Sequence, residues 1–250
     1  MMKISDSSMS RRQFLGSTAV TVLFVSTPDA VARSISGRLP WSPFAASPPV
    51  PVKPGPWLFF TYDEAVTVEA IVDRLIPADE LSVGGKDAGC AVFIDRQLAG
   101  FFGRSERDYM KGPFVKGTPQ QGRQSPILPT ERYRAGLALL NEYCRTSFSG
   151  KNFAELAPEE QDQVLQGLEK GTVELGGTDA KTFFELLLQN TMEGFFADPI
   201  YGGNKDMASW KMIGFPGARY DYRDFVTRHN ERYPLPPVSI MGRADWAAKG

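Results

Sequence analysis

The sequence contains only two cysteines, Cys90 and Cys144, and a single histidine, His229. Attachment of a c-type haem requires a Cys-x-x-Cys-His motif. The two cysteines are far apart, and neither is directly followed by a histidine. Iron–sulfur clusters are usually held by four thiolates, and structural zinc by four cysteine or histidine ligands. The sequence therefore predicts no haem, iron–sulfur or structural zinc site in this chain.

The familiar motifs of dinucleotide binding and of nucleophilic catalysis are also missing. None of the glycine pairs belongs to the Gly-x-Gly-x-x-Gly turn of a dinucleotide site. No Gly-x-Ser-x-Gly elbow accompanies His229, and its polar surroundings predict a surface residue. The stretch with Asp198, Asn204 and Asp206 lacks the ligand spacing of a calcium loop. We therefore predict no catalytic, cofactor-binding or metal-binding residues in this chain.

The chain has little excess charge of either sign, with 28 Lys and Arg residues against 29 Asp and Glu residues. A net charge of −1 gives no positive field for a phosphate backbone, so nucleic acid is not an expected partner. Long hydrophobic runs are missing as well, because no stretch reaches the roughly 18 to 20 apolar residues that a spanning helix needs. We expect the mature chain to be soluble by itself.

The N-terminal region has the features of an export signal. Arg11 and Arg12 precede a mildly apolar run over 16–25, which is the arrangement of a twin-arginine signal. Ala30 and Ala32 flank Val31 in the small-x-small pattern that signal peptidase accepts, so we expect cleavage after Ala32 and a signal over 1–32. The alternative is an N-terminus in which two arginines are adjacent by chance.

Residues 33–57 are expected to form an extended arm or linker. Seven prolines lie between positions 37 and 56, and each fixes φ and removes a backbone donor, which favours polyproline-like chain. Trp41, Phe44 and Trp57 interrupt this arm. These aromatic residues either dock on a neighbouring surface or pack back on the chain's own domain.

The remaining sequence predicts an all-α fold with about five principal helices, long irregular loops and the extended proline-rich arm. Thr61 and Glu64 form a capping box, which predicts a helix that ends before Pro77. Helical spacing of apolar residues predicts four more: one carrying Val92 to Phe101, one from about Thr130 to Phe148, one from Pro158 to Gly171, and one capped by Asp179 and carrying Phe183 to Phe195. Residues 103–129 are rich in glycine and proline and are expected to form a surface excursion.

The two cysteines allow three states. A Cys90–Cys144 disulfide would close a loop of about 53 residues and contribute roughly 4 kcal/mol in the chain-entropy model. Alternatively, both are buried free thiols on helices, or one of them bonds to another chain.

The stretch from Phe195 to Gly217 is a long loop dense in glycine, aromatic and Asn/Asp residues, and such loops commonly carry function. It resembles the signature of the gluconate 2-dehydrogenase subunit 3 family. The resemblance continues in the stretches 69–79 (EAIVDRLIPAD) and 89–98 (GCAVFIDRQL), and covers about 58–217. It divides the chain after the arm into a helical small-subunit domain over 58–219 and a C-terminal extension over 220–250. Residues 104–124 and the extension match no pattern.

The resemblance implies a non-catalytic small subunit of a membrane-bound, flavin-dependent gluconate 2-dehydrogenase or a related sugar dehydrogenase. In such complexes a large FAD-containing subunit oxidises the sugar and a multihaem cytochrome c passes electrons to membrane quinone. The FAD and haem c belong to those partner subunits, and the small subunit helps the flavoprotein mature and leave the cytoplasm. The implied location is the periplasmic face of the inner membrane, with membrane association through the cytochrome. The resemblance does not identify which sugar or sugar acid is oxidised.

We expect this chain to bind the flavoprotein through the helical body and the 198–217 loop. Interface energy concentrates in a few buried aromatic anchors, so the predicted interface residues are Tyr201, Asn204, Trp210 and Phe215. The alternative is that this loop packs on its own helices. Two other functions remain open at this point: an autonomous periplasmic enzyme, and an export chaperone that is released from the mature complex.

Overall fold

The computed structural model describes residues 50–53, 55–115, 117–121, 124–219 and 221–242. The expected export signal, with Arg11, Arg12 and the cleavage site at Ala32, lies outside the described residues. So do Trp41 and Phe44 of the expected arm.

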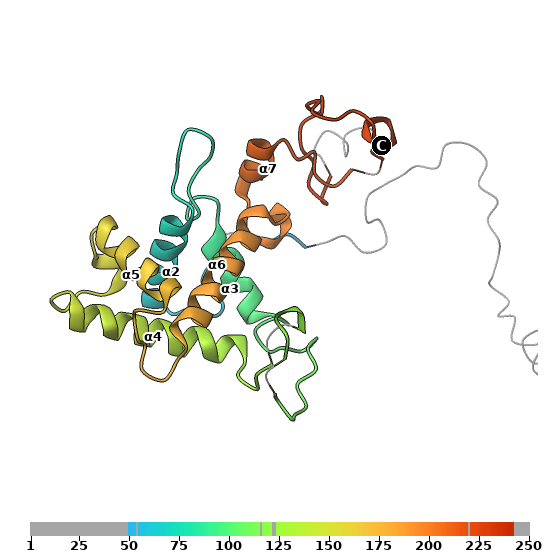
Figure 1. Ribbon diagram of the computed structural model, residues 1–250. Helices are drawn as coiled ribbons and strands as arrows, with labels where there is room; N and C mark the ends of the chain where they lie inside the picture. Colours follow the sequence, from blue (N-terminus) through green and yellow to red (C-terminus); the bar gives the residue numbers. More distant parts are fainter. Residues whose placement is uncertain (1–49, 54, 116, 122–123, 220, 243–250) are drawn as a thin grey trace, which may run out of the picture. The chain divides into compact units, whose positions relative to one another are not determined.

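Helices make up the regular structure of the described residues, and no strand occurs among them, which confirms the all-α prediction (Figure 1). The five principal helices are α2 (Tyr62–Leu75), α3 (Cys90–Ala99), α4 (Pro129–Ser147), α5 (Pro158–Lys170) and α6 (Ala180–Phe196). A sixth and shorter helix, α7 (Ala208–Ile213), lies inside the predicted loop. Short 3₁₀ turns are η1 (Pro119–Gln121), η2 (Phe153–Glu155), η3 (Pro199–Tyr201), η4 (Lys205–Met207) and η5 (Arg223–Phe225). Across the described ranges, no helix combines the length and the apolar character needed to cross a membrane.

Local capping motifs fix where the helices begin and end. The Thr61 side chain accepts from the backbone N–H of Glu64 while the Glu64 carboxylate accepts from the N–H of Thr61, so the predicted capping box is present. Asp179 caps α6 by accepting from Thr182 N at 2.8 Å. Gly171 ends α5 at φ 68°, a left-handed conformation that glycine adopts without steric cost.

The expected extent of the second helix was wrong at its C-terminal end. The helix α3 ends at Ala99, and Phe101 lies beyond it with 56% of its surface exposed. The chain turns back after Gly100, and Gly103 N donates to Gln97 O at 3.2 Å. A Cβ on Gly103 would lie 1.8 Å from Leu98 O, so only glycine allows this close return.

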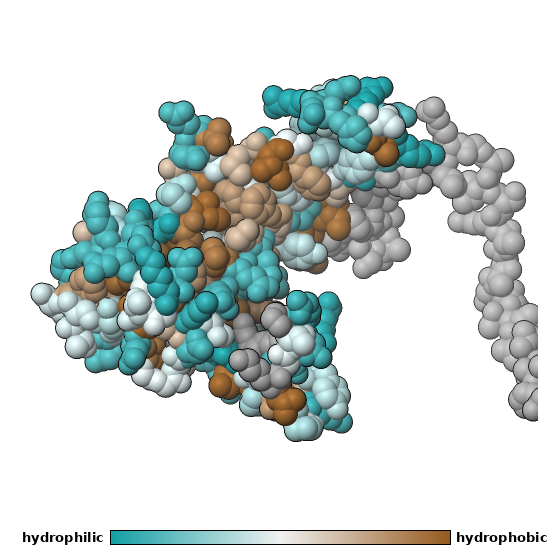
Figure 2. Space-filling view, viewed as in Figure 1, coloured by the Kyte–Doolittle hydropathy of each residue, from teal (hydrophilic) through white to brown (hydrophobic). Residues whose placement is uncertain are grey.

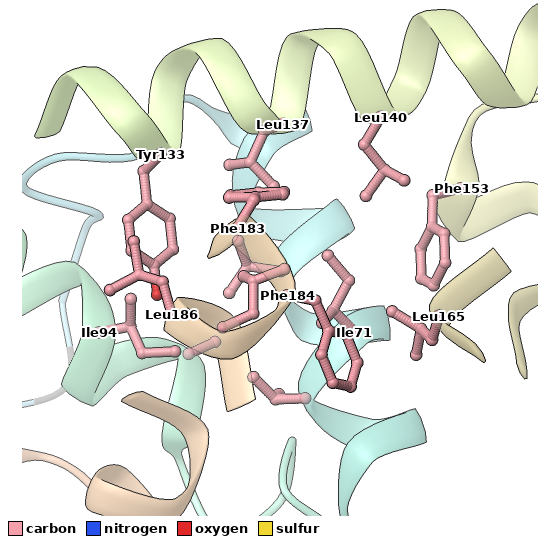
Figure 3. Packing of buried hydrophobic residues seen from close by; sticks show 14 of the residues in the cluster. Ile71, Ile94, Tyr133, Leu137, Leu140, Phe153, Leu165, Phe183, Phe184 and Leu186 are labelled. Carbon is pink, nitrogen blue, oxygen red and sulfur yellow. The ribbon is translucent and has the colours of Figure 1, made fainter. Parts of the chain in front are cut away.

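The core is organised around α6, which packs against α2, α3, α4 and α5. From α4, Tyr133, Leu137 and Leu140 point toward Phe183 and other buried residues of this core (Figure 3). These side chains are almost fully buried, so the hydrophobic effect holds the helices together.

A buried carboxylate fixes the point at which the chain enters this helical body. Asp95 is fully buried on α3, and its oxygens accept hydrogen bonds from the backbone N–H groups of Leu58, Phe59 and Phe60, each at 2.9 Å. Its charge is balanced by an ion pair with Arg96. A buried charge is tolerated only when it is paired and hydrogen-bonded, and both conditions are met here.

The last aromatic residue of the expected arm belongs to the helical body. Trp57 is partly buried against the core, and its ring lies edge-on to Phe60, with the ring centroids 6.3 Å apart. Of the two interpretations of the arm's aromatic residues, packing on the chain's own domain holds for Trp57.

Candidate binding surface

The segment 198–217 connects the end of α6 to the C-terminal extension, and Asp198 is its first fixed point. Asp198 Oδ1 accepts from Ile200 N at 3.0 Å and thereby caps η3. The same carboxylate accepts from the Ser239 hydroxyl at 2.7 Å and from Ile240 N at 2.6 Å. One side chain therefore shapes the turn that carries Tyr201 and also holds the C-terminal extension.

The buried side chain of Asn204 holds the middle of the segment in place through hydrogen bonds. Its side chain is fully buried, with Nδ2 donating to Ala197 O at 2.8 Å. Its Oδ1 accepts from both the backbone N–H of Ser209 at 3.0 Å and the Ser209 hydroxyl at 2.8 Å. Asn204 also has a positive φ of 44°, a conformation that asparagine tolerates better than most residues. The residue links the end of α6 to the start of α7.

Backbone contacts hold the segment against the helical body. Lys205 N donates to Ala88 O at 3.0 Å. A Cβ placed on Gly203 would lie 2.1 Å from Gly194 O in α6, so the two backbones meet at a distance that only glycine permits. The segment is therefore an ordered part of the fold and not a free loop.

Trp210 is the internal support of the segment. Only 6% of its surface is exposed, and its indole N–H donates to Phe196 O at 3.0 Å. The Phe215 ring lies edge-on to it with centroids 5.1 Å apart, and Phe215 N donates to Trp210 O at 2.8 Å. Trp210 thus holds Phe215 in a fixed position at the surface.

Four large hydrophobic side chains of this region are exposed, and we call them the apolar surface. Their exposed fractions are 38% for Phe196, 49% for Tyr201, 56% for Ile213 and 43% for Phe215. Figure 2 shows hydrophobic side chains gathered around α7. Exposed apolar groups on a rigid support are typical of protein interaction sites.

The structure separates the four predicted interface residues into two pairs. Tyr201 and Phe215 are exposed, whereas Asn204 and Trp210 are buried and packed on the chain's own helices. The alternative interpretation, in which the loop packs on its own helices, therefore holds for the second pair. Phe196 and Ile213 are exposed as well, which the sequence did not predict, because nothing in their spacing distinguishes them from core residues.

Both cysteines are free and buried on helices. Burial raises the pKa of the Cys90 thiol to about 12 and, against a smaller opposing effect of Arg145, that of Cys144 to about 11. The two thiols are therefore not bonded to each other in this structure, and a bond from either one to another chain stays a prediction. His229 is exposed, as expected. Over the described residues, no group of three or more His, Cys, Asp or Glu side chains could hold a metal ion.

The C-terminal extension packs beside this segment and leaves two cavities. Ala218 N donates to Val238 O at 2.7 Å, and Val238 N donates to Pro216 O at 3.2 Å. The cavities, of about 260 Å³ and 760 Å³, lie between residues 210–216 on one side and residues 222–237 on the other.

Comparison with known proteins places most of the helical body in one family. Residues 62–217 match the family described as gluconate 2-dehydrogenase subunit 3. No curated protein and no solved structure matches the chain significantly. The matched range begins at the first residue of α2 and ends where the extension joins the 198–217 segment.

Proposed function

Because the chain belongs to the gluconate 2-dehydrogenase subunit 3 family, we propose that it is the non-catalytic small subunit of a flavin-dependent sugar or sugar-acid dehydrogenase. In this proposal it binds the large FAD-containing subunit and supports its maturation. Oxidation of the substrate occurs on the FAD of the large subunit, and the electrons leave through a multihaem cytochrome c.

The observation that carries this proposal is the construction of the apolar surface. Tyr201 and Phe215 are exposed, but the backbone around them is fixed by Asp198, Asn204 and Trp210. Such preorganisation lowers the entropic cost of association, because the binding residues are already in place. A rigid aromatic surface suits a stable contact with another folded protein.

The proposal also accounts for the sequence at the N-terminus. Arg11 and Arg12 have the arrangement of a signal read by the twin-arginine route, which accepts folded cargo. A flavoprotein that acquires FAD in the cytoplasm would be carried across the membrane with this chain. The mature complex would then lie at the periplasmic face of the inner membrane, associated with it through the cytochrome.

The experiment is capture of the proposed flavoprotein subunit. The two proteins are co-expressed and the complex is purified through an affinity tag on this chain. We expect the Tyr201→Ser/Phe215→Ser double variant to weaken the complex by several hundred-fold or more, because two central aromatic contacts each contribute about 2 kcal/mol or more and every 1.4 kcal/mol is tenfold.

The matched control is Tyr109→Ser, which removes an aromatic residue that is 82% exposed on the 103–129 excursion. This variant should capture the flavoprotein as well as the wild type does. Circular dichroism of all three proteins checks that the fold is retained. Equal capture by the double variant and the control would contradict the assignment of this surface.

A further inference from the structure

The larger cavity beside the apolar surface is a cleft whose two walls are formed by different segments of the chain. One wall is formed by α7 and the residues after it, including Lys211 and Ile213. The other is formed by the C-terminal extension, including Phe225, Arg228 and Arg232. Its volume of about 760 Å³ is large enough for several side chains of a bound segment.

Positive charge predominates in this cleft. Its charged residues are Lys211, Arg228, Glu231 and Arg232. Arg228 has partners, because its guanidinium lies 4.0 Å from the Glu231 carboxylate and 5.0 Å from the centroid of the Phe225 ring. Among the described residues, neither Lys211 nor Arg232 has an ion pair or a side-chain hydrogen bond, and both are exposed.

The two cations without partners border the same two cavities. Lys211 and Arg232 each border both the cleft and the smaller cavity of about 260 Å³. Apolar side chains accompany them, since Ile213 is 56% exposed and Val226 is 68% exposed in the cleft, and Leu235 is 52% exposed in the smaller cavity. The two cavities therefore combine positive charge with hydrophobic contact area.

The wall formed by the extension lies outside the residues that match the family, which end at position 217. Of the cations in the cleft, Arg228 and Arg232 therefore lie outside the matched range, whereas Lys211 lies within it. A surface of this kind can give specificity for one partner, because complementary charge selects among partners more than it raises affinity.

We propose that this cleft binds an acidic segment of the flavoprotein subunit, with carboxylates next to Lys211 and Arg232 and hydrophobic side chains against Ile213 and Val226. The inference rests on the proposed function, since it identifies the chemistry of the partner at one edge of the same interface. An extended acidic segment fits better than a small anion, because exposed apolar side chains lie beside the cations in both cavities and a small anion would leave them uncovered.

The first test uses a defined probe and does not need the flavoprotein. A fluorescein-labelled peptide of sequence Glu-Leu-Glu-Glu-Leu-Glu is titrated with the mature chain, and its anisotropy is measured. We expect binding to the wild type, at least about tenfold weaker binding to Lys211→Glu/Arg232→Glu, and little binding of the matched Gln-Leu-Gln-Gln-Leu-Gln peptide. The control variant is Arg223→Glu, because Arg223 pairs with Asp221 and does not border either cavity.

The second test measures the complex with the flavoprotein at about 0.05 M and about 0.5 M salt, because salt screens exposed charges. The double variant should bind at least about tenfold more weakly than Arg223→Glu at low salt, and the difference should shrink at high salt. Equal affinity and equal salt dependence of the two variants would overturn the inference, even if the Tyr201 and Phe215 variants confirm the apolar surface. If the wild type captures no flavoprotein, the proposed function fails, and equal peptide binding by the wild type and the double variant would then overturn the cleft as well.

Discussion

The Ser239 hydroxyl donates a 2.7 Å hydrogen bond to Asp198 Oδ1, although the two residues are 41 positions apart in the sequence. Asp198 also accepts from Ile200 N and Ile240 N, so its carboxylate joins η3 to the C-terminal extension. The position of Tyr201 and the position of the extension thus depend on the same side chain.

Replacement of Asp198 by asparagine should loosen the extension without unfolding the helical body. The asparagine amide has only one acceptor oxygen and cannot accept hydrogen bonds at both positions, so we expect a loss of about 1–2 kcal/mol in the local stability of this contact. Hydrogen–deuterium exchange should become faster at Ile240 and Val238, while amides of α6 keep their protection. Asp224→Asn is the control, because Asp224 is exposed. Unchanged exchange at Ile240 would contradict this role of Asp198.

Replacement of Asp95 by asparagine should destabilise the whole helical body. The Asp95 carboxylate accepts three backbone N–H groups and pairs with Arg96 in a buried position. Hydrogen bonds to a charged group are worth about 1.5–3 kcal/mol each, and the amide keeps only one acceptor oxygen, so we expect the free energy of unfolding to fall by about 2–3 kcal/mol. Urea denaturation measures this loss, and the exposed Asp108→Asn should show almost none.

Replacement of Gly136 by alanine should disturb the crossing of α4 and α6. A Cβ at this position would lie 2.4 Å from the Phe183 ring, which must then move within a packed core. Overpacking of this kind costs typically about 1–3 kcal/mol, in spite of the better helix propensity of alanine. Thermal unfolding should show a lower midpoint for Gly136→Ala than for Ala135→Leu, which adds volume on the exposed side of α4. A midpoint equal to that of the wild type would show that the ring has room to move.

The two cysteines should resist labelling in the folded chain. Because burial raises both pKa values, to about 12 and about 11, the thiols stay protonated at about pH 8, where an ordinary cysteine is partly ionised. Iodoacetamide under native conditions should leave the mass unchanged, and in denaturant without reductant it should add two labels. Failure to label in denaturant would instead indicate a disulfide.

The sequence predicted the helices best where a local motif defines their ends. The Thr61 and Glu64 capping box, Pro158 in the first turn of α5 and the Asp179 cap act over three or four residues, so they can be read directly. The long helices also have a periodic apolar face that is visible in a short window. For these reasons the five principal helices and the all-α class were predictable.

The residues that the sequence did not reveal act over long distances. Asp95 holds backbone groups more than 30 positions away, and Asp198 holds Ser239, so neither role appears in any short window. Aromatic density in the 198–217 segment indicated its importance, but it could not show that Trp210 is buried and Phe215 exposed. That difference depends on the hydrogen bond from Trp210 to Phe196 O and on the turn at Gly214.

The most direct measurement is the amount of FAD-loaded large subunit in the periplasm of cells that express it with or without this chain. With the wild-type chain, we expect flavin fluorescence and sugar-dependent dye reduction in the periplasmic fraction. With no chain, or with Arg11→Lys/Arg12→Lys in the export signal, the flavoprotein should remain in the cytoplasm. Normal export and activity of the flavoprotein in the absence of this chain would contradict the proposed function.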